Sequence, residues 1–254
     1  RLTHVHDEFR FPNIATPPGS SAYYLVRFSP PALRDRQAVL FAWRRELQRL
    51  QNSSDPGVAR LKLDFWRREL QPEQLAQSRH PLARMIHAQL PREASRLSAL
   101  ADLTEQEILA GQSRDWEQLV ERCGAIGGAF ASLLTSAHTD DASHQRSAER
   151  IGLVDETTRL LQHIGRKEYL QRFPPLEGRD AAGTIAEWIL DLRGRAMHAS
   201  RSIPPGPAAA QLAIALALLD TFSREPGLLL EASVDLTPIK KLWLVWRNRA
   251  RMRQ

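Results

Sequence analysis

Hydrophobic residues recur along most of the chain at the three- and four-residue spacing of amphipathic α-helices. The pattern is clearest between Ala38 and Leu70. At about 100° per residue, the apolar side of the first helix in this stretch holds Val39, Leu40, Trp43, Leu47 and Leu50. The opposite side holds Phe41, Arg45, Gln48, Arg49 and Asn52. The pattern therefore predicts a helix with one buried face and one largely polar face.

The rest of the chain predicts helix after helix. Pro12, Pro17, Pro18 and Gly19 interrupt any periodicity over residues 1–20, which we predict to be an extended lead-in to a single domain spanning residues 21–254. Further helices are predicted at residues 21–28, from Asp55-Pro56 through Phe65-Trp66-Arg67, at 73–90, at 184–198 and at 208–222. Residues 138–147 are predicted to form a polar loop.

Composition is typical of a globular chain. Of the 254 residues 43% are hydrophobic, and the mean hydropathy is −0.39, which argues against a disordered or polytopic membrane protein. The apolar run at 208–222 is too short and too rich in alanine for a membrane span. A single cysteine, Cys123, excludes an internal disulfide and a cysteine-based zinc cage.

The net charge of +6 and the pI of about 10.1 favour anionic partners such as diphosphates, acidic lipids or nucleic acid. No nucleic-acid recognition module is visible, so we expect no nucleic-acid partner. From Trp243 to Arg253 tryptophan and leucine alternate with arginine. This pattern is compatible with peripheral contact to an anionic membrane and equally with a packed terminal helix that has a basic tail.

Candidate metal chemistry is weak. Glycine-rich phosphate loops, nucleophile elbows and zinc spacings are absent. The loop at 138–147 contains His138, Asp140, Asp141 and His144, a mixture that invites a metal interpretation. Their spacing matches no known cage, so a solvated loop is the default interpretation.

Several segments resemble the squalene/phytoene synthase family, the head-to-head prenyltransferases. The first is Leu40-Phe41-Ala42-Trp43-Arg44-Arg45-Glu46, which is followed by Leu63-Asp64-Phe65-Trp66-Arg67. The family reads aromatic-Ala-Phe-x-Arg-Glu-x-Asp-Asp-x-x-Asp on this helix. Arg45 and Glu46 match, whereas Gln48, Arg49 and Asn52 stand where the aspartates belong.

The resemblance continues through Leu109-Ala110-Gly111, the run Cys123 to Ala129, residues 148–170 and Leu236 to Trp243. Small residues after Cys123 favour close helix crossing, or the close approach of an isoprenoid chain. The family has a second aspartate-rich helix. In this chain the residues nearest to the positions of its aspartates are His163 and Lys167. Asp155 and Glu156 lie one or two turns earlier and remain available for polar roles.

The resemblance implies an all-α isoprenoid-synthase (terpenoid synthase) fold, a helical bundle around a central cavity. Family enzymes ionise prenyl diphosphates held through Mg²⁺, which prefers carboxylate oxygens. Because those carboxylates are missing, we expect no metal and no cofactor. The resemblance also places Ser21 and Tyr24 near the diphosphate end of the cavity. The expected substrate-binding residues are therefore Ser21, Tyr24, Arg45, Gln48, Arg49, Asn52, His163 and Lys167.

The first functional hypothesis is a pseudoenzyme that binds an isoprenoid or prenyl-diphosphate-like lipid and has lost Mg²⁺-dependent prenyl transfer. A second is an active prenyltransferase of isoprenoid biosynthesis. A third is an assembly factor with a protein partner, as in the mitochondrial complex I assembly branch of the family. Its Phe-Trp-Lys pattern resembles Phe65-Trp66-Arg67. We expect a cytoplasmic protein, peripheral at the inner membrane, or an organellar matrix protein if a targeting segment was removed.

Overall fold

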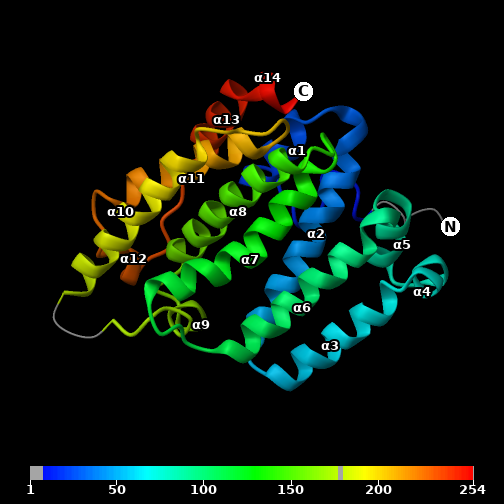
Figure 1. The fold of residues 1–254 in the computed structure, drawn as a ribbon, viewed down its shortest axis with the longest axis horizontal. Coiled ribbons are helices and arrows are strands. Elements are labelled where there is room, and N and C mark those ends of the chain that lie inside the picture. The colour runs from blue at the N-terminus through cyan, green and yellow to red at the C-terminus, as the bar shows by residue number, and fades with distance from the viewer. Residues whose placement is uncertain (1–7, 177–179, 254) are drawn as a thin grey trace. The chain divides into compact units, whose positions relative to one another are not determined.

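The computed structural model describes residues 8–176 and 180–253, and these residues form helices, turns and loops without a β-strand (Figure 1). The all-α prediction is therefore confirmed for the described chain. Contacts within the chain divide it into two compact units, Arg1–Leu109 and Ala110–Gln254. The single domain at 21–254 stays a prediction.

The first unit is organised around α2. Its helices are α1 Ser21–Phe28, α2 Arg34–Gln51, α3 Pro56–Glu69, α4 Pro72–Gln77, α5 Pro81–Gln89 and α6 Ala94–Ala110, with short 3₁₀ helices at Pro31–Leu33 and Pro91–Glu93. α1, α3 and α5 all pack against α2. Residues 37–43 of α2 are buried on every side, including Phe41, which is only 8% exposed. The sequence pattern had placed Phe41 on the polar face. That placement was wrong, because periodicity along one helix does not show how many other helices surround it.

The predicted helix at 73–90 is two helices instead. α4 ends at Gln77, and His80 precedes Pro81 with an extended backbone, φ −71° and ψ 127°. A proline disfavours helical geometry in the residue before it and has no N–H to donate. His80 Nδ1 accepts a hydrogen bond from the Leu82 backbone at 3.2 Å and so caps α5. The single-helix prediction was wrong because Pro81 begins a new helix.

The described part of the lead-in, residues 8–20, forms turns that are fastened to α2. Asn13 Nδ2 donates to the carbonyl oxygens of Phe9 and Ala38, at 2.9 and 3.1 Å. Its Oδ1 accepts from the Ala15 backbone at 2.8 Å. These bonds hold the turns in place without a helix. Residues 1–7 of the predicted lead-in lie outside the described residues.

The second unit is built on the antiparallel neighbours α7 and α8, which pack together more extensively than any other pair of helices in the described chain (Figure 1). Its helices are α7 Trp116–Thr135, α8 Ala142–Gln162, α9 Lys167–Leu170, α10 Ala181–Ala199, α11 Ala208–Phe222, α12 Leu228–Glu231, α13 Pro238–Arg247 and α14 Arg249–Met252. A Cβ on Gly127 would lie 2.2 Å from the Gly152 carbonyl oxygen, and one on Gly152 would lie 2.1 Å from the Gly127 carbonyl oxygen. The small-residue run is thus a close helix crossing, as the first of the two interpretations predicted.

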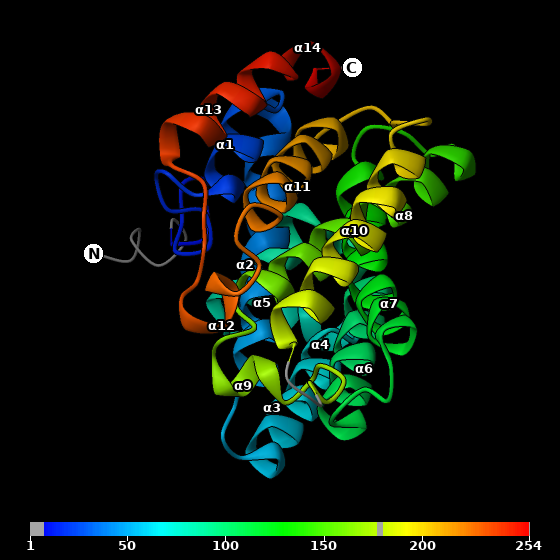
Figure 2. The ribbon, with the colours of Figure 1, turned by 90° about the vertical axis from the view of Figure 1, so that its left-hand side faces the viewer.

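The remaining helices cover this pair. α10 and α11 pack on α8, and α13 and α14 pack on α11 (Figure 2). α11 has the predicted bounds, whereas α10 starts three residues before the predicted Thr184 because Asp180 caps it through the Gly183 backbone. Among the described residues, no helix combines the length and apolar character that a membrane span requires.

Candidate functional site

Four predicted site residues form a polar stripe on the last turns of α2. Arg45, Gln48, Arg49 and Asn52 are spaced three and four residues apart and therefore share one side of the helix. Arg45 Nη1 donates to the Ile14 carbonyl oxygen at 3.2 Å. Asn52 ends the helix, where its backbone N–H donates to the Gln48 carbonyl oxygen at 3.1 Å. We call these four residues the α2 stripe.

The charge of Arg49 is partly balanced within α2 itself. Arg49 Nη1 lies 2.8 Å from Glu46 Oε2, and the Arg49 side chain is 62% exposed. The carboxylate nearest to the stripe is therefore already engaged with a guanidinium. The pair is solvent-exposed, and exposed pairs contribute only about 0–1 kcal/mol.

The donor set of the α2 stripe does not fit Mg²⁺. This ion requires hard, preferably anionic oxygens in near-octahedral geometry. The stripe offers two neutral amides and two guanidinium groups, which repel a cation. In the part of the chain that the structure describes, no three His, Cys, Asp or Glu side chains gather closely enough to hold a metal ion. No reaction step through magnesium follows from these residues.

Two further predicted residues lie on α1, which packs against α2. Ser21 is the first residue of α1, but the cap is Ser20, whose Oγ accepts from the Tyr23 backbone at 3.0 Å. Tyr24 is half-buried, and its ring meets Tyr23 edge to face at a centroid distance of 5.4 Å. Ser21 and Tyr24 therefore belong to the same unit as the α2 stripe.

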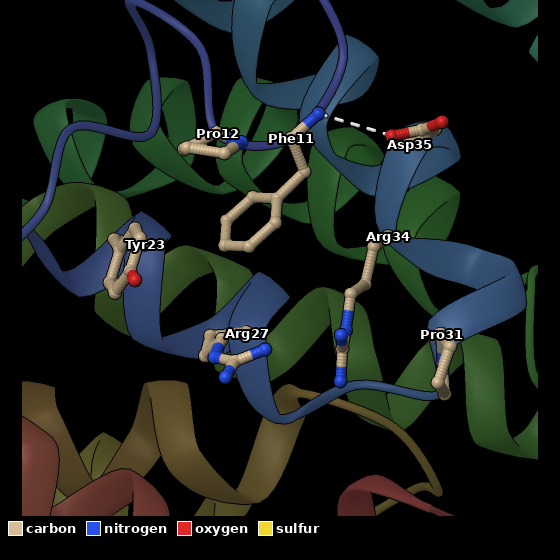
Figure 3. Close-up of a pocket in the computed structure, with 7 residues that line it drawn as sticks. All are labelled: Phe11, Pro12, Tyr23, Arg27, Pro31, Arg34 and Asp35. Atoms are coloured by element: carbon tan, nitrogen blue, oxygen red, sulfur yellow. Dashed lines mark hydrogen bonds between the residues drawn. The ribbon is translucent and has the colours of Figure 1, made fainter.

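The first unit also contains an open pocket of about 380 Å³ that the sequence did not predict. Figure 3 shows its lining, in which the ring of Phe11 and the guanidinium groups of Arg27 and Arg34 point toward the same space. Asp35 is held at the rim, where it accepts from the Phe11 backbone at 3.1 Å. None of the predicted site residues lines this pocket. The two arginines flank a Pro-Pro turn, so no helical spacing pointed to them.

In the second unit, His163 ends α8 as an uncharged side chain. Its Nδ1 lies 2.8 Å from Ser233 Oγ, and its ring is 5.1 Å from the Tyr169 ring. Burial, together with the positive charges of Arg159 and Arg166, lowers the pKa of His163 to about 4. His163 is therefore neutral near pH 7. The predicted cation on this side is Lys167, which is exposed at the first position of α9.

Close to His163 the structure places a buried ion pair on α8. The Arg159 guanidinium contacts the Glu156 carboxylate through two nitrogens, and Glu156 is only 4% exposed. Burial opposes the charge of Arg159, but the contact with Glu156 outweighs burial and raises the pKa of Arg159 above its usual value. The sequence had left Glu156 available for a polar role. It gave no sign of the partner, because a spacing of three residues is equally common on exposed faces.

The predicted polar loop at residues 138–147 is shorter than expected. α8 begins at Ala142, so only residues 138–141 remain outside a helix. Asp141 Oδ1 accepts from the Ser143 backbone at 2.7 Å and caps the helix. Hydrogen bonds from the Ser143 side chain and then from its backbone lower the pKa of Asp141. The loop prediction at 138–147 was therefore wrong beyond Asp141.

The described helices form an all-α bundle of the isoprenoid-synthase type. Its α2 stripe lacks the carboxylates that a metal site requires. The sequence matches the model of the squalene/phytoene synthase family over residues 15–200, and the chain belongs to that family. The structure is similar to the crystal structure of a dehydrosqualene synthase in complex with ligand, with a TM-score of 0.68, 12% sequence identity, and coverage of 91% of this chain and 90% of that one. At this identity the likeness shows the fold. A comparison with curated proteins gave no match.

Proposed function

We propose that this protein binds an isoprenoid or prenyl-diphosphate-like lipid without a divalent metal and has lost metal-dependent prenyl transfer. The observation that carries the proposal is the α2 stripe, in which the amides of Gln48 and Asn52 and the guanidinium of Arg49 stand where the resemblance places the family's aspartates. Family membership and the fold support the class of ligand.

Direct cation contacts are a physically coherent replacement for metal ions. A guanidinium group presents a planar fork of N–H donors that matches phosphate oxygens, and such charge-assisted bonds are stronger than neutral ones. Arg49 is 62% exposed and its pairing with Glu46 is weak, so a diphosphate competes for it at little cost. Arg45 keeps further donors besides the nitrogen that meets Ile14.

The remaining predicted residues receive separate roles in this proposal. We assign Lys167, in the second unit, as a cation available to an anionic ligand, because its side chain is exposed. Ser21 and Tyr24 of the first unit are assigned hydrogen-bonding roles, and so, separately, is the uncharged His163 of the second unit. Gln48 and Asn52 contribute amide N–H donors.

Thermal unfolding with farnesyl diphosphate tests the proposal. We expect this probe to raise the melting temperature equally in EDTA and in Mg²⁺, because the chain itself supplies the cations. Inorganic pyrophosphate and farnesol, tested alone, separate head-group binding from chain binding. A rise that requires Mg²⁺ and is accompanied by release of pyrophosphate contradicts the proposal and supports an active prenyltransferase.

A variant pair tests the assigned residues. Arg49→Gln should weaken farnesyl diphosphate binding by roughly tenfold or more, since a hydrogen bond to a charged group contributes about 1.5–3 kcal/mol. Lys62→Gln removes an exposed charge from α3 and serves as the matched control, for which we expect unchanged affinity. Calorimetric titration measures both. Equal affinity of both variants and the parent protein removes Arg49 from the site.

A further inference from the structure

α13 carries two apolar stripes on opposite sides. One stripe consists of Leu244 and Val245, which are buried. α13 packs against α11. The other consists of Ile239, Leu242, Trp243 and Trp246, which are 77%, 38%, 49% and 47% exposed. Their spacing of three, four and seven residues is that of a continuous helix face. We call these four residues the outer stripe of α13.

The helix is held firmly while its outer stripe is left uncovered. Lys241 Nζ lies 2.6 Å from Asp235 Oδ2, on the buried side. Thr237 caps the start of α13 through the Lys240 backbone at 3.3 Å. Large exposed side chains gathered on one face, rather than scattered singly, mark an interaction surface.

The charge of the chain is concentrated at the same place. Of the 35 lysines and arginines, six lie in residues 236–254, whereas none of the 29 aspartates and glutamates does. The net charge of +6 therefore belongs entirely to this segment, and the remainder of the chain is neutral overall.

Basic groups lie directly on the outer stripe. The Arg247 guanidinium sits 4.6 Å from the Trp243 ring centroid, and that of Arg249 sits 4.0 Å from the Trp246 ring centroid. Each contact keeps a cation beside an exposed indole. Lys240 is exposed next to Ile239.

We propose that the outer stripe of α13 docks on the surface of an anionic lipid bilayer. Indole rings prefer the boundary between head groups and acyl chains, and flanking lysines and arginines attract anionic lipids. The charge complementarity favours this occupant over a neutral protein surface. The helix would lie in the plane of the membrane, with the outer stripe toward the acyl chains and the buried stripe kept on α11. This surface is distinct from the α2 stripe.

Vesicle flotation with the full chain tests the docking. We expect the protein to float with phosphatidylglycerol-rich vesicles and to remain unbound with pure phosphatidylcholine vesicles, because the attraction is to anionic head groups. High salt should reduce binding. Tryptophan emission should shift to shorter wavelength on binding, because indole rings leave water. These vesicles contain no prenyl diphosphate, so this result is independent of the proposed lipid ligand.

Paired variants assign the surface. Trp243→Ala with Trp246→Ala should weaken partitioning by at least about tenfold, whereas Leu190→Ala with Met197→Ala, which are exposed on α10, should leave it unchanged. A second pair tests the charges. Lys240→Gln with Arg247→Gln should lose about fivefold for each charge removed.

The control for charge is Arg201→Gln with Arg224→Gln, both exposed elsewhere in the second unit. Matching melting temperatures show that each variant folds, so any loss of binding is local. Equal binding to neutral and anionic vesicles, or losses as large in the controls, overturns the proposal. So does a dimer that the tryptophan variant abolishes while vesicle binding stays absent, because a second copy of the chain then covers the stripe.

Discussion

Replacing Gly152 by alanine tests the helix crossing on which the second unit is built. The new Cβ would lie 2.1 Å from the Gly127 carbonyl oxygen and 2.7 Å from the Ala131 Cβ, whereas ordinary contact starts at 3.4 Å. Because two of the obstacles are the backbone and a short side chain, no rotamer change relieves them. α7 and α8 must therefore separate by roughly 1 Å at this point.

The magnitude follows from two opposing effects. Overpacking of a well-packed core costs about 1–3 kcal/mol, and a backbone obstacle places Gly152→Ala at the upper end. Alanine in a helix interior regains about 1 kcal/mol relative to glycine. The net loss is about 2 kcal/mol in the free energy of unfolding. In a chain of this size that lowers the melting temperature by roughly 4–8 °C.

Gly194→Ala is the matched control. Gly194 also lies inside a helix of the second unit, α10, but a Cβ there would meet nothing within 4 Å. We expect this variant to gain about 1 kcal/mol from helix propensity alone. Urea unfolding followed by circular dichroism measures both variants. If Gly152→Ala is as stable as the parent protein while Gly194→Ala behaves as expected, the close approach of α7 and α8 is refuted.

Three further perturbations probe other local contacts. The folded-state pKa of His163, about 4, lies below the usual 6.5, so between these pH values the unfolded chain binds more protons than the folded chain. The free energy of unfolding should therefore fall as pH drops from 6.5 to 4, and His163→Asn should flatten this fall. NMR titration of the His163 ring should show no protonation near pH 7. Arg67→Gln removes contacts to Asp102 and Glu105 on α6 and should lower the free energy of unfolding by about 1–2 kcal/mol, less at high salt, whereas Arg68→Gln should change it little. Equal losses for the two variants in urea titrations would contradict a stabilising role for the Arg67 ion pairs. Asp115→Ala removes the cap of α7 and should lower stability by about 1 kcal/mol in the same assay, with an unchanged midpoint as the contrary result.

Local signals in the sequence explain the elements that were predicted correctly. The bounds of α1 and α11 match because each is delimited by Pro, Gly or Ser residues within a few positions. The same local reasoning failed at Pro81, where an apolar run continues across a break in the helix. Periodicity reports the spacing of apolar residues but not whether one helix or two carry them.

The candidate site was predictable in its composition and less so in its contacts. The missing aspartates of the α2 stripe are a fact of the sequence. The contact of Arg49 with Glu46 is a matter of side-chain orientation, and the neutral state of His163 depends on Ser233, Arg159 and burial. Ser233 lies 70 positions away, so no spacing rule relates it to His163.

By itself the sequence determined the helical class, the family resemblance, the absence of carboxylates from the α2 stripe and the basic segment at residues 236–254. These properties are local or additive, since each depends on residue identity and on spacing within a few turns. The tertiary structure decided that Gly127 faces Gly152, that Phe41 is buried, and which apolar stripe of α13 is covered. Such outcomes depend on which distant surface meets each helix face, and that choice is made only when the helices pack.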